Sequence, residues 1–222
     1  KYKRGHVLVR SGPMPSTGAS RLAAISALRS GAGAVTLASE TNALEVNASH
    51  LTAVMLKEIN TEDEFFNFAK QKKINTLIIG PGNGVDKKTK NIAIRAIKEE
   101  FGLILDADGL TSFEKNPKQL FDLLKKRKKR DNVILTPHEG EFNRLFNFSN
   151  MDKIEKTRKA SDMTNSTILY KGNDTVISSS KKTSLIAKES SSFLSTAGSG
   201  DILAGICGGL IAQGMKSNDA AA

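Results

Sequence analysis

The segment STAGSGDILAG, residues 195–205, carries the clearest chemical signal in the sequence. A glycine-rich turn runs into an apolar stretch, and the free backbone N–H groups at such a helix start favour a bound anion such as phosphate. Gly198 and Gly200 would let the backbone approach that ligand closely. Asp201 places a second anion there, so two interpretations stay open: a helix cap, or a base that removes a proton beside a phosphoryl group.

Further polar and glycine-rich segments come directly after predicted strands. They are GPGNG (80–84), the aspartates Asp106 and Asp108, TPHEGEF (136–142) and KGNDT (171–175). Each alone could be a local feature, such as a turn or the cap of a helix. Ligands of an open α/β sheet bind at the carboxyl ends of its strands, so together these segments predict one site at that edge.

The spacing of these residues excludes several familiar sites. GSGDIL has neither the Gly-Lys-Ser/Thr of the eight-residue phosphate loop nor the third glycine of the dinucleotide motif. One cysteine and three scattered histidines give no zinc-binding spacing, and no Gly-x-Ser-x-Gly nucleophile elbow occurs. The sequence therefore predicts a phosphate site of another kind.

The elements that must position these residues alternate between strands and helices. Strands are predicted in runs rich in Val, Ile and Leu, at 6–10, 34–39, 52–59, 75–80, 102–108, 132–137, 166–172, 174–179 and 183–187. Helices are predicted at 16–31, 86–101, 117–124, 139–148, 151–163 and 201–214. In the first helix, Leu22, Ala24, Ile25 and Leu28 recur at helical spacing as its apolar face.

This alternation predicts an α/β fold with a mainly parallel sheet and helices on both faces. The turn-rich KGND (171–174) between two close strands predicts a hairpin near the end of the sheet, and the serine clusters at 178–183 and 189–192 predict loops. We expect residues 1–222 to form one domain. SNDAAA at the C-terminus, with Asn218 or Asp219 as N-cap, predicts the first turn of a helix that continues beyond residue 222.

The net charge of +10 favours anionic ligands without identifying one. KKRKKR, residues 125–130, follows a predicted helix and is interpreted as its solvated C-terminus. A nucleic-acid patch is the alternative, disfavoured because aromatic residues make up only 5% of the chain and none lies within the run. No apolar run reaches the roughly 18 residues of a membrane span. Cys207 lies in an apolar segment, which predicts a buried thiol compatible with a reducing cytosol.

Six segments together resemble the NAD(P)H-hydrate dehydratase family of the ribokinase-like superfamily. They are LRSGAG (28–33), IGPGNG (79–84), LDADGL (105–110), LTPHEGEF (135–142), KGNDT (171–175) and TAGSGDILAG (196–205). The resemblance implies a three-layer α/β/α sandwich. It also implies an activity: hydrated NADH or NADPH is phosphorylated on its ring hydroxyl, and phosphate then leaves to restore the dihydronicotinamide.

The resemblance also implies roles for individual residues. Asp201 would be the base on the hydroxyl, and the amides of Gly198, Ser199 and Gly200 would hold the transferred phosphoryl group. Three residues would contact the hydrated dinucleotide: Ala19, Gly82 and His138. The adenine nucleotide would be lined by Lys171, Gly172, Asn173, Asp174 and Thr175, with Gly200 near its phosphates. Asp106 and Glu141 would hold Mg²⁺, directly or through water.

The Pro-His-x-Gly-Glu form of residues 137–141 resembles the bacterial branch, which implies ADP as phosphoryl donor. The resemblance further implies a cytoplasmic homo-oligomer, a possible fusion to an upstream NAD(P)H-hydrate epimerase domain, and no nucleic-acid or membrane partner. Two other functions stay open. One is a small-molecule kinase of the hydroxymethylpyrimidine, thiazole or pyridoxal type, and the other is a non-catalytic nucleotide- or RNA-binding domain.

Overall fold

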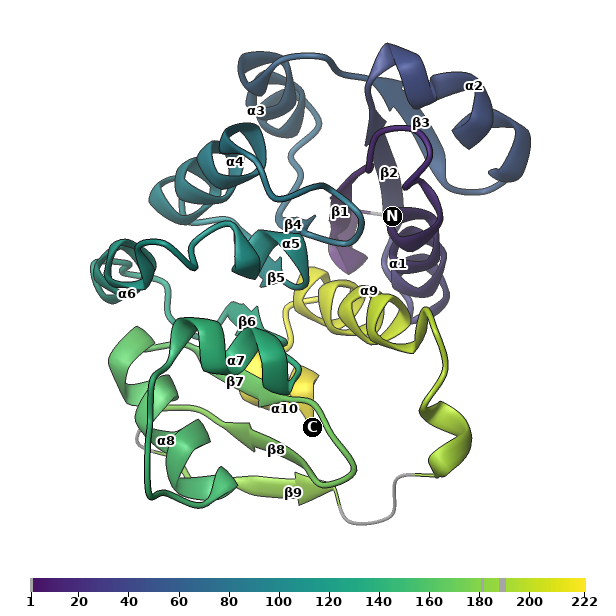
Figure 1. Ribbon diagram of the computed structural model, residues 1–222. Helices are drawn as coiled ribbons and strands as arrows, with labels where there is room; N and C mark the ends of the chain where they lie inside the picture. The colour runs from purple at the N-terminus through teal and green to yellow at the C-terminus, as the bar shows by residue number, and fades with distance from the viewer. Residues whose placement is uncertain (1, 181, 188–190) are drawn as a thin grey trace.

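The computed structural model describes residues 2–180, 182–187 and 191–222, which form a nine-stranded sheet with strand order β3-β2-β1-β4-β5-β6-β7-β8-β9 (Figure 1). The strands are β1 (His6–Arg10), β2 (Ala34–Ser39), β3 (Met55–Glu58), β4 (Thr76–Ile79), β5 (Gly102–Leu105), β6 (Val133–Leu135), β7 (Thr167–Tyr170), β8 (Thr175–Ser178) and β9 (Leu185–Ala187). Each lies within a predicted run, so all nine strand predictions are confirmed. Part of the loop predicted at 189–192 lies outside the described residues.

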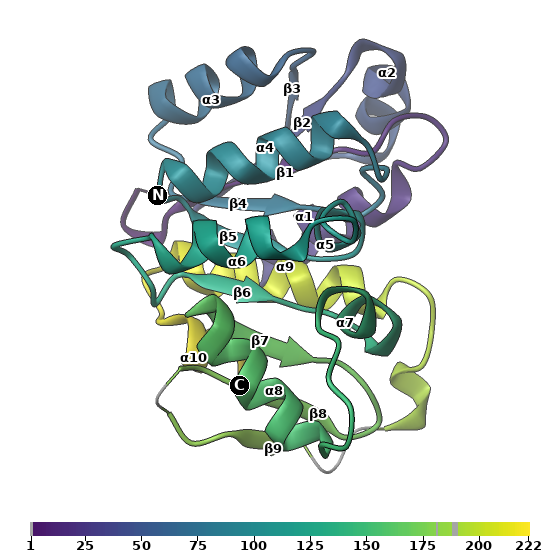
Figure 2. The same cartoon turned by 60° about the vertical axis from the view of Figure 1, so that its left-hand side comes forward.

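Strands β1 to β7 pair in parallel, whereas β8 and β9 are antiparallel additions at one edge. The predicted hairpin is therefore confirmed as β7 and β8, which pair in the register Leu169 to Ile177. The parallel strands share one direction, so their carboxyl ends meet at a single edge of the sheet (Figure 2). The segments that follow those strands are thereby brought to the same side of the molecule.

Helices cover both faces of the sheet (Figure 2). The α-helices are α1 (Gly18–Arg29), α2 (Thr41–His50), α3 (Glu62–Gln71), α4 (Lys87–Lys98), α5 (Asp108–Thr111), α6 (Pro117–Lys125), α7 (Glu139–Leu145), α8 (Lys153–Thr164), α9 (Ser199–Ala212) and α10 (Ser217–Ala221). Short 3-10 turns occupy Tyr2–Arg4 and Ser192–Leu194. The helices α3, α4, α6, α7 and α8 pack on one face, and α1, α9 and α10 pack on the other.

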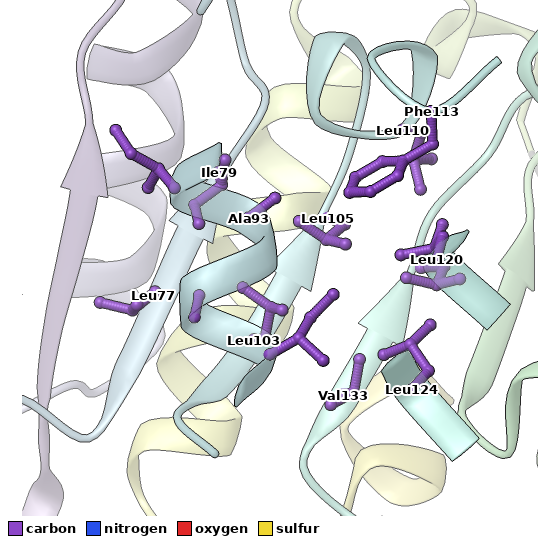
Figure 3. Packing of buried hydrophobic residues seen from close by; sticks show 14 of the residues in the cluster. Leu77, Ile79, Ala93, Leu103, Leu105, Leu110, Phe113, Leu120, Leu124 and Val133 are labelled. Atoms are coloured by element: carbon purple, nitrogen blue, oxygen red, sulfur yellow. The ribbon is translucent and has the colours of Figure 1, made fainter. Parts of the chain in front are cut away.

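Each face of the sheet has its own hydrophobic core because successive strand residues point to opposite sides. Leu77 and Leu103 point toward α4 and α6, in the core shown in Figure 3, whereas Ile78 and Ile104 point toward α1 and α9. Strands buried on both faces read as continuous apolar runs, which is why they could be located from sequence. The predicted burial of Cys207 on α9 is confirmed, and burial raises the pKa of its thiol to about 12.

The apolar face predicted for α1 is only partly correct. Ala24 is buried, but Leu22 and Ile25 are exposed over more than a third of their surface. The helix instead turns its small residues toward α9: a Cβ at Gly205 would collide with Ala23, and one at Gly209 would collide with Ala27. The small residues of α1, rather than Leu22 and Ile25, therefore form its contact with α9.

Three helices were not predicted. The polar residues of α2 mask its periodicity, whereas α3 carries two signals that were missed: an apolar face of Phe65, Phe66 and Ala69, and a capping box between Thr61 and Glu64. The four-residue α5 is too short to give a periodic signal. The predicted N-cap of the last helix is wrong, because α10 begins at Ser217, whose buried hydroxyl accepts a hydrogen bond from Thr167.

The basic run at 125–130 is solvated as predicted, except at Arg127. Arg127 is 4% exposed, and its guanidinium donates to five acceptors, with the shortest bonds to Ile97 O at 2.7 Å, Phe101 O at 2.8 Å and Asn132 Oδ1 at 2.9 Å. It joins the end of α4 to the starts of β5 and β6. Burial without a contacting carboxylate lowers the pKa of Arg127 to about 10.

Within the described part of the chain, no helix combines the length and apolarity needed to cross a bilayer.

The substitution Arg127→Ala tests whether the hydrogen bonds of the buried Arg127 guanidinium stabilise the fold. We expect it to lower the free energy of unfolding by about 3 kcal/mol, because several buried carbonyl groups would lose their donors. Lys128→Ala, which removes an exposed neighbouring charge, should change it by less than about 0.5 kcal/mol. Denaturant titration of both variants measures the difference, and equal losses would show that Arg127 is merely another surface charge.

Candidate active site

The N-terminus of α9 lies at the carboxyl edge of the sheet (Figure 2). Its N-cap is Gly198, whose φ of +90° favours glycine, and no side chain caps the helix there. A Cβ at Gly198 would lie 2.7 Å from Leu22 Cδ1 of α1, so the turn also has little room for a side chain. Asp201 is the third residue of the helix rather than its N-cap, so the cap interpretation is wrong.

Asp106 and Lys171 form an ion pair beside this helix start. Asp106, at the end of β5, is 2% exposed, and its Oδ1 accepts hydrogen bonds from Lys171 Nζ at 2.7 Å and from Thr136 Oγ1 at 2.8 Å. A Cβ built at Gly200 would lie 3.3 Å from Lys171 Nζ, so the ammonium group lies against the first turn of α9. A cation therefore stands beside the helix amides that would bind an anion.

Asp201 has the electrostatic setting of a general base. Partial burial raises the pKa of this carboxyl to about 6, repulsion from Asp106 adds to the rise, and attraction to Lys171 opposes it. The group is thus a carboxylate at neutral pH but a much better proton acceptor than an exposed aspartate. A pKa near the operating pH is the one that suits general base catalysis.

His138 and Glu141 form a reciprocal cap at the start of α7. His138 Nδ1 accepts from Gly140 N at 2.9 Å, and Glu141 Oε2 accepts from His138 N at 2.9 Å. Glu141 is 5% exposed, and burial raises the pKa of its carboxyl, with a further rise caused by Asp106 and opposition from Lys171. The His138–Glu141 pair is therefore electrostatically linked to the Asp106–Lys171 pair.

Ala19, in the first turn of α1, and Gly82, in the loop after β4, lie next to each other at the same edge of the sheet. A Cβ at Gly82 would lie 3.4 Å from that of Ala19, and its φ of +66° favours glycine. The loop is held by Asn83, which is 1% exposed: its Oδ1 accepts from Gly80 N, and its Nδ2 donates to Arg10 O, each at 2.9 Å. This clamp ties the loop after β4 to the end of β1.

The KGNDT segment divides between the site and the hairpin turn. Lys171 points to Asp106, whereas Asp174 is exposed and pairs with Lys153 at 2.8 Å. Gly172 lies against the same lysine, since a Cβ there would be 2.5 Å from Lys153 Nζ, and Thr175 Oγ1 donates to Gly172 O. Asn173 is exposed in the turn. Only the first residue of the segment therefore contacts the charged cluster.

Sequence reasoning missed three buried polar residues around the site. Thr136 follows β6 directly and holds Asp106, and Asn83 clamps the loop that carries Gly82. Arg10 ends a strand whose three central residues are apolar, is 6% exposed, and donates to Thr89 Oγ1 at 2.6 Å, while burial lowers the pKa of its guanidinium. For Arg10 and Thr136 the available signal was a polar residue at the end of a buried strand, and for Asn83 it was a polar residue inside the glycine-rich segment 80–84.

No three His, Cys, Asp or Glu side chains cluster to hold a metal ion in the ranges that the structure describes. Asp106 Oδ1 is occupied by Lys171 and Thr136, and both oxygens of Glu141 face His138. The site has three carboxyl groups, of Asp106, Glu141 and Asp201, but only one ammonium group, that of Lys171, and a divalent cation would offset the excess of negative charge. Mg²⁺ commonly binds few protein carboxylates and completes its coordination shell with water and phosphate oxygens. These residues therefore fit a Mg²⁺ ion that they contact through water molecules.

Comparison with known proteins shows the family to which this chain belongs. A model of the NAD(P)H-hydrate dehydratase family matches residues 7–222, nearly the whole chain. The chain belongs to this family. A bifunctional NAD(P)H-hydrate repair enzyme from Synechocystis is 32% identical over 221 residues, covering 97% of this chain and 41% of that enzyme. The chain spans less than half the length of the curated family relatives that it matches.

Solved structures confirm the ribokinase-like sandwich. A ribokinase-like superfamily protein from Enterococcus faecalis superposes with a TM-score of 0.81 at 22% identity, covering 100% of this chain and 78% of that one. An ADP/ATP-dependent NAD(P)H-hydrate dehydratase from Bacillus subtilis, co-crystallised with ATP and Mg²⁺, gives 0.75 at 24% identity, covering 95% and 73%. The described chain therefore has the fold of these proteins over 95% or more of its length, and it covers 78% and 73% of theirs.

Lys171→Met tests whether the ammonium group holds Asp106. Removal of one partner from a largely buried pair leaves the other charge without compensation, and we expect a loss of about 3 kcal/mol in the free energy of unfolding. Lys153→Met breaks the more exposed pair with Asp174 and should cost less than about 1 kcal/mol. Urea titration of both proteins compares the losses, and a reversed order would contradict the assignment.

Proposed function

We propose that this chain dehydrates hydrated NADH and NADPH, with ADP as phosphoryl donor. The observation that carries the proposal is the half-buried Asp201 carboxylate in the first turn of α9, beside the amides of the helix start and the Lys171 ammonium group. A base next to an anion site suits transfer of a phosphoryl group to a hydroxyl. Membership of the hydrate dehydratase family supports the hydroxyl of the hydrated nicotinamide ring as that acceptor.

The reaction follows in two balanced steps. Asp201 takes the proton of the ring hydroxyl as its oxygen bonds to the β-phosphorus of ADP, and AMP leaves. The bond between ring carbon and phosphate oxygen then breaks, the ring loses a proton, and its carbon–carbon double bond is restored. The products are NAD(P)H, AMP, phosphate and a proton. Phosphorylation is needed because phosphate is a far better leaving group than hydroxide.

The chain's own residues would bind and orient both substrates. The amides of Gly198, Ser199 and Gly200, together with Lys171, would surround the transferred phosphoryl group. The hydrated dinucleotide would lie against Ala19, Gly82 and His138, which share the carboxyl edge of the sheet. The adenine nucleotide would extend from Gly200 along the segment 171–175. An excess of positive charge in the chain favours the approach of two polyanions.

Asp106 and Glu141 would hold Mg²⁺ through water, with the remaining ligands from phosphate oxygens. When bound, the ion would neutralise charge on the phosphates of the donor.

We propose also that residues 1–222 act as one catalytic domain of a cytoplasmic homo-oligomer. The relatives named bifunctional repair enzymes are more than twice as long as the matched region, which supports fusion to an upstream epimerase domain in the natural protein.

One assay separates this function from the alternatives. Hydrated NADH is incubated with ADP or with ATP, and the recovered absorbance of the dihydronicotinamide is followed. We expect recovery with ADP. Phosphorylation of hydroxymethylpyrimidine without recovery would support a vitamin-precursor kinase instead. Salt-sensitive RNA binding without turnover, lost on neutralising the exposed lysines of 125–130, would support the non-catalytic alternative.

Asp201→Asn removes the proposed base while keeping the size of the side chain. We expect kcat to fall by about 10³-fold or more, with ADP affinity changed by less than about threefold, because the helix amides remain. Asp122→Asn, on the exposed side of α6, is the matched control and should keep full activity. A near-normal kcat for Asp201→Asn would exclude general base catalysis by this residue.

The pH dependence follows from the raised pKa of Asp201. The base works only as a carboxylate, so kcat/KM, which reports ionisations of the free enzyme, should fall as pH drops through about 6 and stay level above it. Carbon-13 NMR of labelled aspartate in the free protein should show a carboxyl titrating near that value, and this signal should vanish in Asp201→Asn. A titration at the ordinary value for aspartate would contradict the effect of burial and of Asp106.

A further inference from the structure

Lys153, the first residue of α8, lies next to the turn that follows β7. Its Nζ donates to Asp174 Oδ1 at 2.8 Å and to Lys171 O at 3.4 Å. Gly172 is also close, because a Cβ there would lie 2.5 Å from the same Nζ. The side chain of Lys153 is 22% exposed, whereas that of Asp174 is 65% exposed. One ammonium group therefore lies against three of the five residues proposed to line the adenine nucleotide.

The packing around Lys153 fixes where its charge lies. Nζ is 4.6 Å from the centre of the Tyr170 ring, and this ring is stacked on Phe142 with 4.2 Å between the ring centres. The backbone that carries Lys153 is fixed by a capping box, in which Asp152 accepts a hydrogen bond from Glu155 N at 2.8 Å. The aromatic stack and the helix cap therefore limit how far the ammonium group can move from the turn.

The turn also lies among carboxylates that would repel an anionic ligand. The hydrogen bond from Lys153 holds the pKa of the Asp174 carboxyl below its ordinary value, so Asp174 is ionised at neutral pH. Burial raises the pKa of the Tyr170 hydroxyl, and the negative charges of Glu139 and Asp174 add to the rise. Two carboxylates thus act on this region, and a nucleoside diphosphate would be repelled by either of them if it were not compensated.

We propose that Lys153 is a positioning residue for the adenine nucleotide, which acts by neutralising Asp174 and by holding the turn 171–175. The place of the nucleotide along this turn rests on the proposed function. The ligand chemistry that Lys153 favours is an anionic nucleotide, because its phosphates would otherwise approach an uncompensated carboxylate. Lys153 thereby supports nucleotide binding through Asp174 and the turn rather than by contact with the reacting atoms.

Calorimetric titration with ADP tests this role in Lys153→Met, Asp174→Asn and the variant that combines them. We expect Lys153→Met to raise the Kd for ADP about fivefold at low salt and less than about twofold in roughly 0.5 M salt, because salt screens the uncompensated carboxylate. Asp174→Asn and the double variant should both bind ADP within about twofold of the unaltered protein, since neither has that carboxylate. Arg158→Met, which removes the same charge from an exposed position of α8, is the matched control and should not change the Kd.

Two results would overturn the role of Lys153. One is an unchanged Kd for ADP in Lys153→Met, and the other is a double variant that binds ADP as weakly as Lys153→Met alone. In the assay with hydrated NADH, Lys153→Met should raise the KM for ADP and leave kcat and the KM for hydrated NADH unchanged. If the unaltered protein and its variants bind ADP in the expected pattern but hydrated NADH is not converted, the proposed function fails and the role of Lys153 in nucleotide binding stands.

Discussion

The close packing of α9 against α1 and the sheet is the constraint on which the rest of the site depends. Gly205 and Gly209 let the helix approach α1, and Gly208 lets it approach Ile78 of β4, because a Cβ at any of the three would meet neighbouring atoms. These close contacts restrict how far α9 can shift along α1 and β4. In this position its first turn, which carries Asp201, lies at the carboxyl edge of the sheet, where the loops after β4, β5 and β6 converge.

The charges around the site explain why Asp201, itself an anion, lies at a helix start that would bind an anion. Lys171 supplies positive charge beside the α9 amides, and Asp106 holds it there while repelling Asp201. Partial burial, with the repulsion adding to it, raises the pKa of Asp201 and makes it a stronger base that is still charged at neutral pH. The negative charge of Asp201 is disfavoured by its surroundings, and this makes the carboxylate a useful base. It loses that charge when it takes the proton of a hydroxyl.

The fold was largely readable from the sequence, and the site only in part. Doubly buried strands and glycine-rich turns give local signals, which located the buried strands and the segments at their ends, whereas the exposed strands β3 and β9 were found as short apolar runs. Leu22 and Ile25 were misjudged because helix periodicity does not say which neighbour a helix will approach. The pairing of Asp106 with Lys171 spans 65 residues and the burial of Arg127 depends on three other elements, so no local pattern could reveal them.

The central claim is that the ring hydroxyl is phosphorylated before it leaves. Hydrated NADH carrying oxygen-18 in that hydroxyl tests the claim directly, because phosphorylation transfers the labelled oxygen to the phosphate. With ADP as donor, the account predicts that mass spectrometry finds one labelled oxygen in each phosphate released and none in water. Label released as water, with unlabelled phosphate, would show direct dehydration and contradict the account.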